Sequence, residues 1–143
     1  GLRASWGGPN RMQADRTGSD VRGANLRGAN LMGVKLSGSC LVGASLSGCN
    51  LMGVNLQGID LRGVDLRGAN LSNTNLKGAN LCQANLQGSN LENANLEEAD
   101  LQGADLAGAA LTGANLLCAD LEGTRLEGVS LTGTCLIGTQ LDR

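Results

Sequence analysis

The residues best suited to do chemistry in this sequence are its cysteines and carboxylates, and the chain has no histidine to work beside them. Histidine is the usual general base at neutral pH and the commonest side-chain ligand of transition metals. The cysteines also lack the C-x-x-C spacing that is typical of zinc sites. We therefore expect no enzyme, no metal site and no bound cofactor. The five cysteines are Cys40, Cys49, Cys82, Cys118 and Cys135.

The carboxylates are concentrated in one stretch of the chain. A flat, exposed group of acids offers no desolvated pocket for catalysis, so we interpret it as a candidate surface for binding a protein partner. The alternative is a solvated surface that only keeps the protein soluble. This acidic cluster comprises Glu97, Glu98, Asp100, Asp120 and Glu122.

Charge is distributed unevenly along the chain, although the formal net charge is only −2. Residues 1–80 hold nine Lys or Arg against four Asp or Glu, a balance of +5, whereas residues 81–143 hold two against nine, a balance of −7. No strong basic excess predicts nucleic-acid binding, and no apolar run is long enough to span a bilayer. We therefore expect the chain to bind neither nucleic acid nor a membrane. A looser basic cluster comprises Arg22, Arg27, Arg62 and Arg67.

The element that must position these side chains is a five-residue repeat. Leu occupies every fifth position from Leu26 to Leu141, and Val21 holds the preceding place, which gives 25 units over residues 19–143. We call this position the centre of the unit. The residue two before the centre is small, and is Ala in twelve units; the residue directly before it is Asn or Asp in 17, and the residue two after it is Gly in 19.

A period of five excludes both regular secondary structures. On an α-helix each step of five turns by about 140°, so the centres would form no apolar stripe. In one long strand an odd step sends successive centres to opposite faces. A chain that turns a corner once per unit places every centre, and the small residue two before it, on a common axis. Four corners close a coil of about twenty residues, and stacked coils can pair their backbones.

Several units resemble the repeats of the pentapeptide-repeat family, including Ala24–Gly28, Ala69–Leu71, Ala99–Gly103 and Ala114–Leu116. The resemblance covers residues 19–143 and implies an all-β fold, a right-handed quadrilateral β-helix of about six coils of twenty residues. Many relatives carry Phe at some centres, and this chain has none. Residues 1–18 break the pattern and form either an N-terminal cap, with Trp6 over the first coil, or a linker.

The coil length predicts which outward side chains stack. Arg125 should lie one coil beyond Asp105 and pair with it. Cys49 should point inward, whereas the other four cysteines should point outward. The cysteines should be too far apart to form disulfides. Because free thiols favour a reducing compartment, we expect the protein to be cytoplasmic. Two Asn columns should bond to neighbouring backbone. They contain Asn30, Asn50, Asn70 and Asn90, and Asn55, Asn75, Asn95 and Asn115.

The C-terminal coil predicts a self-association edge. Leu136 and Leu141 lie in this coil, and a solenoid end with no capping helix exposes apolar side chains and unpaired backbone. This edge should be covered either by self-association or by further sequence, and we expect end-to-end homodimers.

Two classes of function remain open. The first is a structural or protein-interaction module that presents its charged faces to a partner. The second is a DNA-mimicking inhibitor or protector of a type II topoisomerase, DNA gyrase, which the resemblance allows because quinolone-resistance members of the family bind that enzyme. The basic first half of this chain favours the first class.

Overall fold

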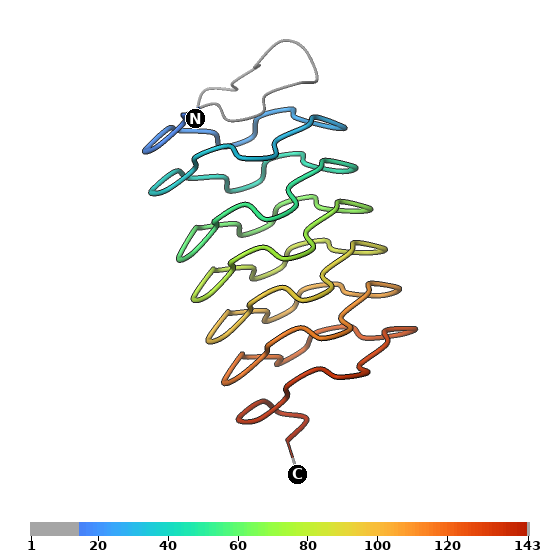
Figure 1. Ribbon diagram of the computed structural model, residues 1–143. Helices are drawn as coiled ribbons and strands as arrows, with labels where there is room; N and C mark the ends of the chain where they lie inside the picture. Colours follow the sequence, from blue (N-terminus) through green and yellow to red (C-terminus); the bar gives the residue numbers. More distant parts are fainter. Residues whose placement is uncertain (1–14, 143) are drawn as a thin grey trace.

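The computed structural model describes residues 15–142, whose backbone winds into coils stacked along one axis (Figure 1). Residues twenty apart pair as parallel β-bridges, from Asp15↔Lys35 to Asn115↔Cys135. A turn follows each bridge residue after one intervening position, so four turns close each coil. Over residues 15–142 the structure contains isolated bridges but no helix and no longer strand, and thus no helix that could cross a membrane.

Each corner is a hydrogen-bonded turn that begins at the centre residue. In the first complete unit the Ala24 N–H donates to the Val21 carbonyl (3.1 Å), and Gly23 between them has φ 66°. Positive φ at the third residue is the feature of a type II turn, and glycine adopts it without strain. The repeated Gly of the sequence therefore marks the corners, as the period of five predicts.

Three backbone hydrogen bonds per unit join a coil to its neighbours. Around Leu26 and Ser45, the Leu26 N–H donates to the Ser45 carbonyl, and the Ser45 N–H donates to the Ala24 carbonyl (2.8 Å each). The Gly28 N–H at the corner donates to Ser47 (2.8 Å). These bonds hold residues twenty apart in register, so outward side chains form columns along the axis.

The core consists of the centres and the small residues two before them. Every centre from Val21 to Leu121 is buried, and so is every small position from Ala24 to Ala119. Burying one Leu side chain contributes roughly 1.5–3 kcal/mol, so the Leu column supplies most of the driving force for folding. The residue after the centre usually points outward, but Ser72 is an exception and is buried at 9% exposure.

The two ends differ from the middle of the stack. Residues 15–18, in the predicted N-terminal lead, already take part in the first coil, since the Gly18 N–H donates to the Ser37 carbonyl (2.8 Å). The capping role predicted for Trp6 lies outside the described residues. At the other end the centres Leu126, Leu131 and Leu136 are only partly buried against the core.

Candidate interaction surface

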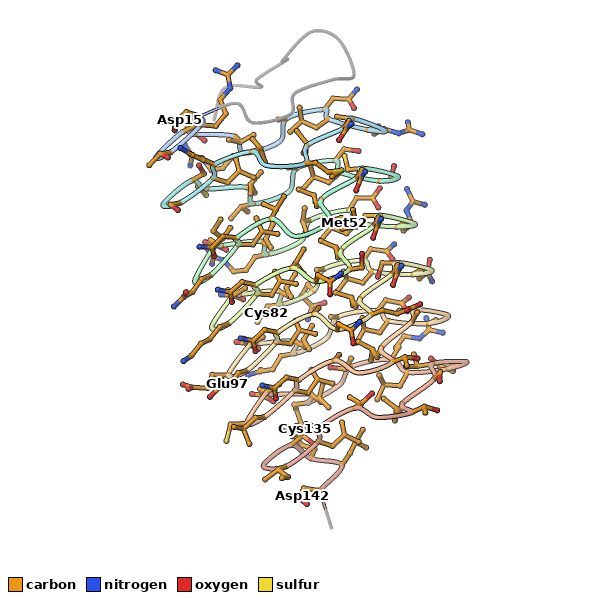
Figure 2. All side chains as sticks on the ribbon, in the orientation of Figure 1. Asp15, Met52, Cys82, Glu97, Cys135 and Asp142 are labelled. Atoms are coloured by element: carbon orange, nitrogen blue, oxygen red, sulfur yellow. The ribbon has the colours of Figure 1, made fainter. Side chains whose placement is uncertain are left out.

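The acidic cluster lies on the C-terminal half of the stack. We call the face that contains the centres Val21, Leu41 and Leu61 the first face. Asp100 and Asp120 are bridged neighbours in adjacent coils on this face, and Glu122 follows at the next turn. Glu97 and Glu98 occupy the adjoining corner, where Figure 2 shows Glu97 at the outer edge of its coil. Glu98 and Glu122 are exposed, and the other three are half-buried.

Asp120 accepts more hydrogen bonds than any other carboxylate of the cluster. Its Oδ1 accepts hydrogen bonds from the Glu122 backbone N–H (3.0 Å) and from Gln140 Nε2 (2.8 Å). Its Oδ2 accepts one from Gln102 Nε2 (2.6 Å). The Glu122 N–H, followed by the two glutamine amides, holds the pKa of Asp120 below its usual value. Among residues 15–142 no Arg or Lys forms an ion pair with the cluster.

The acidic cluster also changes the chemistry of a thiol. Cys82 lies on the same face and is half-buried. Burial raises the pKa of the Cys82 thiol to about 11, and the neighbouring carboxylates of Asp100 and Asp120 add to this increase. A thiol with so high a pKa is a poor nucleophile at neutral pH, so this cysteine is unsuited to catalysis.

The expected basic cluster is largely neutralised within its own repeat units. Arg62 Nε and Nη2 donate to the two carboxylate oxygens of Asp60 at 2.8 and 2.7 Å. The Asp20–Arg22 and Asp65–Arg67 pairs repeat this two-bond geometry. The sequence analysis grouped all four arginines into one basic cluster; the signal that it missed is an Asp two residues before Arg22, Arg62 and Arg67.

Arg27 differs from the other three arginines because Asn25 stands where they have an acid. Its side chain forms no ion pair with any described residue. Together with Asn25, Ser47, Arg67 and corner glycines, Arg27 lines a shallow, open depression on the second face, which contains the centres Leu26, Leu46 and Leu66. The twenty-residue spacing places Arg27, Ser47 and Arg67 in one column. Charge alone does not indicate the depression, because the short residue between the two arginines is uncharged.

The two Asn columns are structural, as predicted, and bond to backbone N–H groups nearby in the chain. Asn50 Oδ1 accepts a hydrogen bond from the Met52 N–H (3.2 Å), two residues later in the same unit, and the other Asn residues of the two columns do the same. The predicted bonds to neighbouring backbone are therefore confirmed, and the backbone N–H groups that they satisfy belong to the turn of the same unit. They brace each unit's own corner as Asx turns. The predicted cross-coil pair is confirmed, with Arg125 Nη1 3.6 Å from Asp105 Oδ2.

The predicted self-association edge presents apolar side chains. Leu136 is half-buried, whereas Leu141 is 41% exposed and the adjacent Ile137 is 63% exposed. Of the cysteines, Cys49 is buried as predicted and Cys118 is exposed, while Cys40, Cys82 and Cys135 are only half-buried; all five are free. No group of three or more potential metal ligands occurs among residues 15–142.

Comparison with known families agrees with this geometry. A model of pentapeptide repeats, in 8 copies, matches residues 13–48, 49–88, 89–128 and 119–143. The chain belongs to the pentapeptide-repeat family. Its fold is accordingly the right-handed quadrilateral β-helix that this family adopts, and pentapeptide-repeat solenoids are generally structural or interaction modules.

Solved structures of the family resemble the chain to different degrees. QnrB1, a plasmid-mediated fluoroquinolone resistance protein, is 20% identical with a TM-score of 0.71, over 92% of this chain and 72% of QnrB1. HetL, involved in heterocyst differentiation regulation in the cyanobacterium Nostoc, is 27% identical with a TM-score of 0.45, over 92% and 76%. A pentapeptide-repeat protein of the Arabidopsis thaliana thylakoid lumen is 37% identical with a TM-score of 0.44, over 68% and 65%. No curated protein matches the sequence.

Proposed function

We propose that this chain is a non-catalytic protein-interaction module that binds a basic surface of a protein partner through its acidic cluster. The observation that carries the proposal is the contrast between the two halves of the stack. In the N-terminal half, three of the four cluster arginines are paired with an Asp of their own unit. In the C-terminal half, the acidic cluster has no ion-pair partner among the described residues, so its charge is available to a ligand.

The hydrogen bonds of Asp100 and Asp120 support the same proposal. Asp120 is fixed by three hydrogen bonds, and Asp100 Oδ1 accepts one from the Gln102 N–H (3.0 Å). Carboxylates that are already ordered lose little conformational freedom on binding, which favours affinity.

A triple variant tests this function without disturbing the fold. Asp100→Asn, Asp120→Asn and Glu122→Gln together remove three charges, and the two Asn side chains keep the oxygens that accept the turn N–H groups. The matched control, Asp60→Asn with Asp65→Asn, removes carboxylates that are occupied by arginine. We expect proteins captured from a lysate of the source cells by the wild type and the control to be lost with the triple variant, with strong salt dependence. Equal capture by all three would contradict the proposal.

The alternative, inhibition or protection of DNA gyrase by DNA mimicry, is favoured by one feature. Asp100 and Asp120 stand one coil apart in a column, with Glu122 beside them, and together they form a short ladder of negative charge. The resemblance to QnrB1 concerns the fold alone. We expect no inhibition in a gyrase supercoiling assay; potent, salt-sensitive inhibition that the triple variant abolishes would favour the mimic instead.

We also propose that the module works in the cytoplasm and forms end-to-end homodimers. Five free thiols suit a reducing compartment. Exposed Ile137 and Leu141 favour association at the C-terminal coil. Sedimentation should detect dimers that Leu141→Lys weakens and that Met52→Lys, a control at another exposed apolar residue, leaves intact. A monomeric wild type would overturn the dimer, and a stoichiometric disulfide in protein from its native cells would argue against the cytoplasm.

A further inference from the structure

The depression on the second face is built from one column of turn residues. Arg27, Ser47 and Arg67 each follow a centre, and the backbone fixes them one coil apart. The Gly28 N–H donates to the Ser47 carbonyl (2.8 Å), and the Gly48 N–H donates to the Arg67 carbonyl (2.9 Å). A short hydroxyl side chain therefore stands between two long cationic ones, which hollows the surface at Ser47.

The charge of this depression is positive. Arg27 forms no ion pair with a described residue, and Arg67 uses Nε and Nη2 on Asp65 (2.9 and 2.7 Å), which leaves Nη1 without that partner. Two guanidinium groups against one carboxylate leave one net positive charge. The Ser47 hydroxyl adds a neutral donor between them.

The corners beside the column leave room for a ligand. A Cβ added at Gly28 or Gly68 would meet no atom within 4 Å, and one at Gly48 would meet only the Gly28 Cα at 3.9 Å. No side chain therefore covers the floor of the depression at these corners, and an anion can approach the backbone closely.

We propose that Arg27, Ser47 and Arg67 bind a phosphoryl oxyanion. Coils lie about 4.8 Å apart, so the two arginine backbones are separated by roughly 10 Å. A phosphoryl group that accepts N–H···O bonds of about 2.8 Å on both sides spans roughly 8 Å between donor nitrogens, a span that two long arginine side chains with this backbone separation can reach. Its third oxygen faces the Ser47 hydroxyl.

The proposal is tested by NMR titration of the full chain with inorganic phosphate and, separately, with O-phospho-L-serine. Ionic strength is held constant with sodium chloride. We expect saturable shifts at the Arg27 and Arg67 Nε–H groups and at the Ser47 amide. Arg27→Gln should weaken binding by about tenfold or more, because charge-assisted hydrogen bonds are lost. Ser47→Ala should weaken it less.

Arg62→Gln is the matched control. Arg62 forms the same two-bond pair with its Asp, and Arg22 lies two coils away in its column, as Arg27 does from Arg67. Here, however, the residue between the two arginines is Val42, which has no hydroxyl, and Arg22 is already paired with Asp20. This variant should bind as the wild type does. Saturation by phosphoserine alone would identify a phosphomonoester as the ligand, and saturation by both would leave the free ion equally suitable. No saturable shift with either probe, or equal weakening by Arg27→Gln and Arg62→Gln, would overturn the site.

Discussion

The side chain of Gln140 completes the cross-coil hydrogen bonding of the first face next to Asp120. Gln140 Oε1 accepts a hydrogen bond from the Leu121 N–H (2.7 Å), while Gln140 Nε2 donates to Asp120 Oδ1 (2.8 Å). One coil earlier the equivalent Leu101 N–H donates to the main-chain carbonyl of Asp120 (2.9 Å). For the Leu121 N–H, the side-chain oxygen of Gln140 therefore replaces the main-chain carbonyl as the hydrogen-bond acceptor. The same side chain satisfies one oxygen of Asp120 at the end of the acidic column.

Gln140→Ala should expose the Leu121 amide. Loss of one such hydrogen bond costs about 1 kcal/mol, so we expect roughly fivefold faster hydrogen exchange at Leu121 when the C-terminal coil opens locally. Gln102→Ala is the control, because Gln102 Nε2 bonds Asp120 Oδ2 and its side chain supports no backbone amide. Unchanged exchange at Leu121 in Gln140→Ala would show that the side chain does not protect this amide.

Leu51→Asp and Met52→Asp should separate the inward and outward positions of one unit. Leu51 is 1% exposed and Met52 is 38% exposed. An unpaired carboxylate at Leu51 costs several kcal/mol and should unfold or split the stack, whereas Met52→Asp should change stability by less than about 0.5 kcal/mol. Thermal unfolding followed by circular dichroism measures both. Similar melting of the two variants would contradict the register.

The fold could be predicted from the sequence because one five-residue pattern fixes the inward positions, the corners and the coil length. The columns followed by arithmetic, which is why Arg125 was correctly placed against Asp105. Pairing within a unit could not be predicted by counting charges, since the Asp65–Arg67 pair depends on the turn that brings residues two apart together. The depression at Arg27 depends on the short side chain of Ser47 and on the pairing of Arg67 with Asp65. It can be predicted only when the stacking of residues twenty apart is considered together with the contacts within each turn.

Ser89→Ala should leave stability unchanged or raise it. Ser89 is 1% exposed, and its hydroxyl oxygen has no hydrogen-bond partner. An unsatisfied buried hydroxyl costs about 1–3 kcal/mol, and Ala is the usual residue at this position of the repeat. Ser39→Ala is the matched control and should destabilise by about 1 kcal/mol, because Ser39 Oγ donates to the Arg16 carbonyl (2.6 Å). Urea unfolding distinguishes them, and a destabilised Ser89→Ala would refute the prediction.

Stability should be flat between about pH 5 and 8 and should fall in acid. The chain has no His, so no side chain with an ordinary pKa titrates in that range. Hydrogen bonds from Arg67 lower the pKa of Asp65, and those from Arg62 lower the pKa of Asp60. A lowered carboxyl pKa contributes stability that is complete above the unfolded value, near 4, and is lost as the pH falls through the folded value.

Asp65→Asn isolates one part of this acid dependence. The variant keeps an oxygen for the Arg67 N–H, which Asp65 Oδ1 accepts at 3.2 Å, and loses only the ion pair. We expect a loss of about 0.2–1 kcal/mol at pH 7 that shrinks as the pH falls below 4 and Asp65 of the wild type is protonated, measured as melting temperature across the pH range. A wild type that loses stability between pH 7 and pH 5 would contradict the assignment to these carboxylates.

The three classes of cysteine burial should appear as three rates of alkylation. Cys118 is exposed and should react first. Burial raises the pKa of Cys82 to about 11, so at pH 8 its thiolate fraction is roughly a hundredfold below that of an unperturbed thiol. Cys49 is 1% exposed, and its Sγ donates to the Leu26 carbonyl at 2.7 Å, so it should react only on unfolding.

Asp100→Asn provides the internal test of this order, because the carboxylate of Asp100 contributes to the raised pKa of Cys82. Removing that charge while keeping the side-chain oxygen should speed labelling of Cys82 and leave Cys118 and Cys49 unchanged. Peptide mass spectrometry after timed alkylation reports all three sites in one sample. If Cys82 were labelled as fast as Cys118 in the wild type, the acidic cluster would not influence the thiol. The half-burial of Cys82 beside Asp100 and Asp120 would then be wrong.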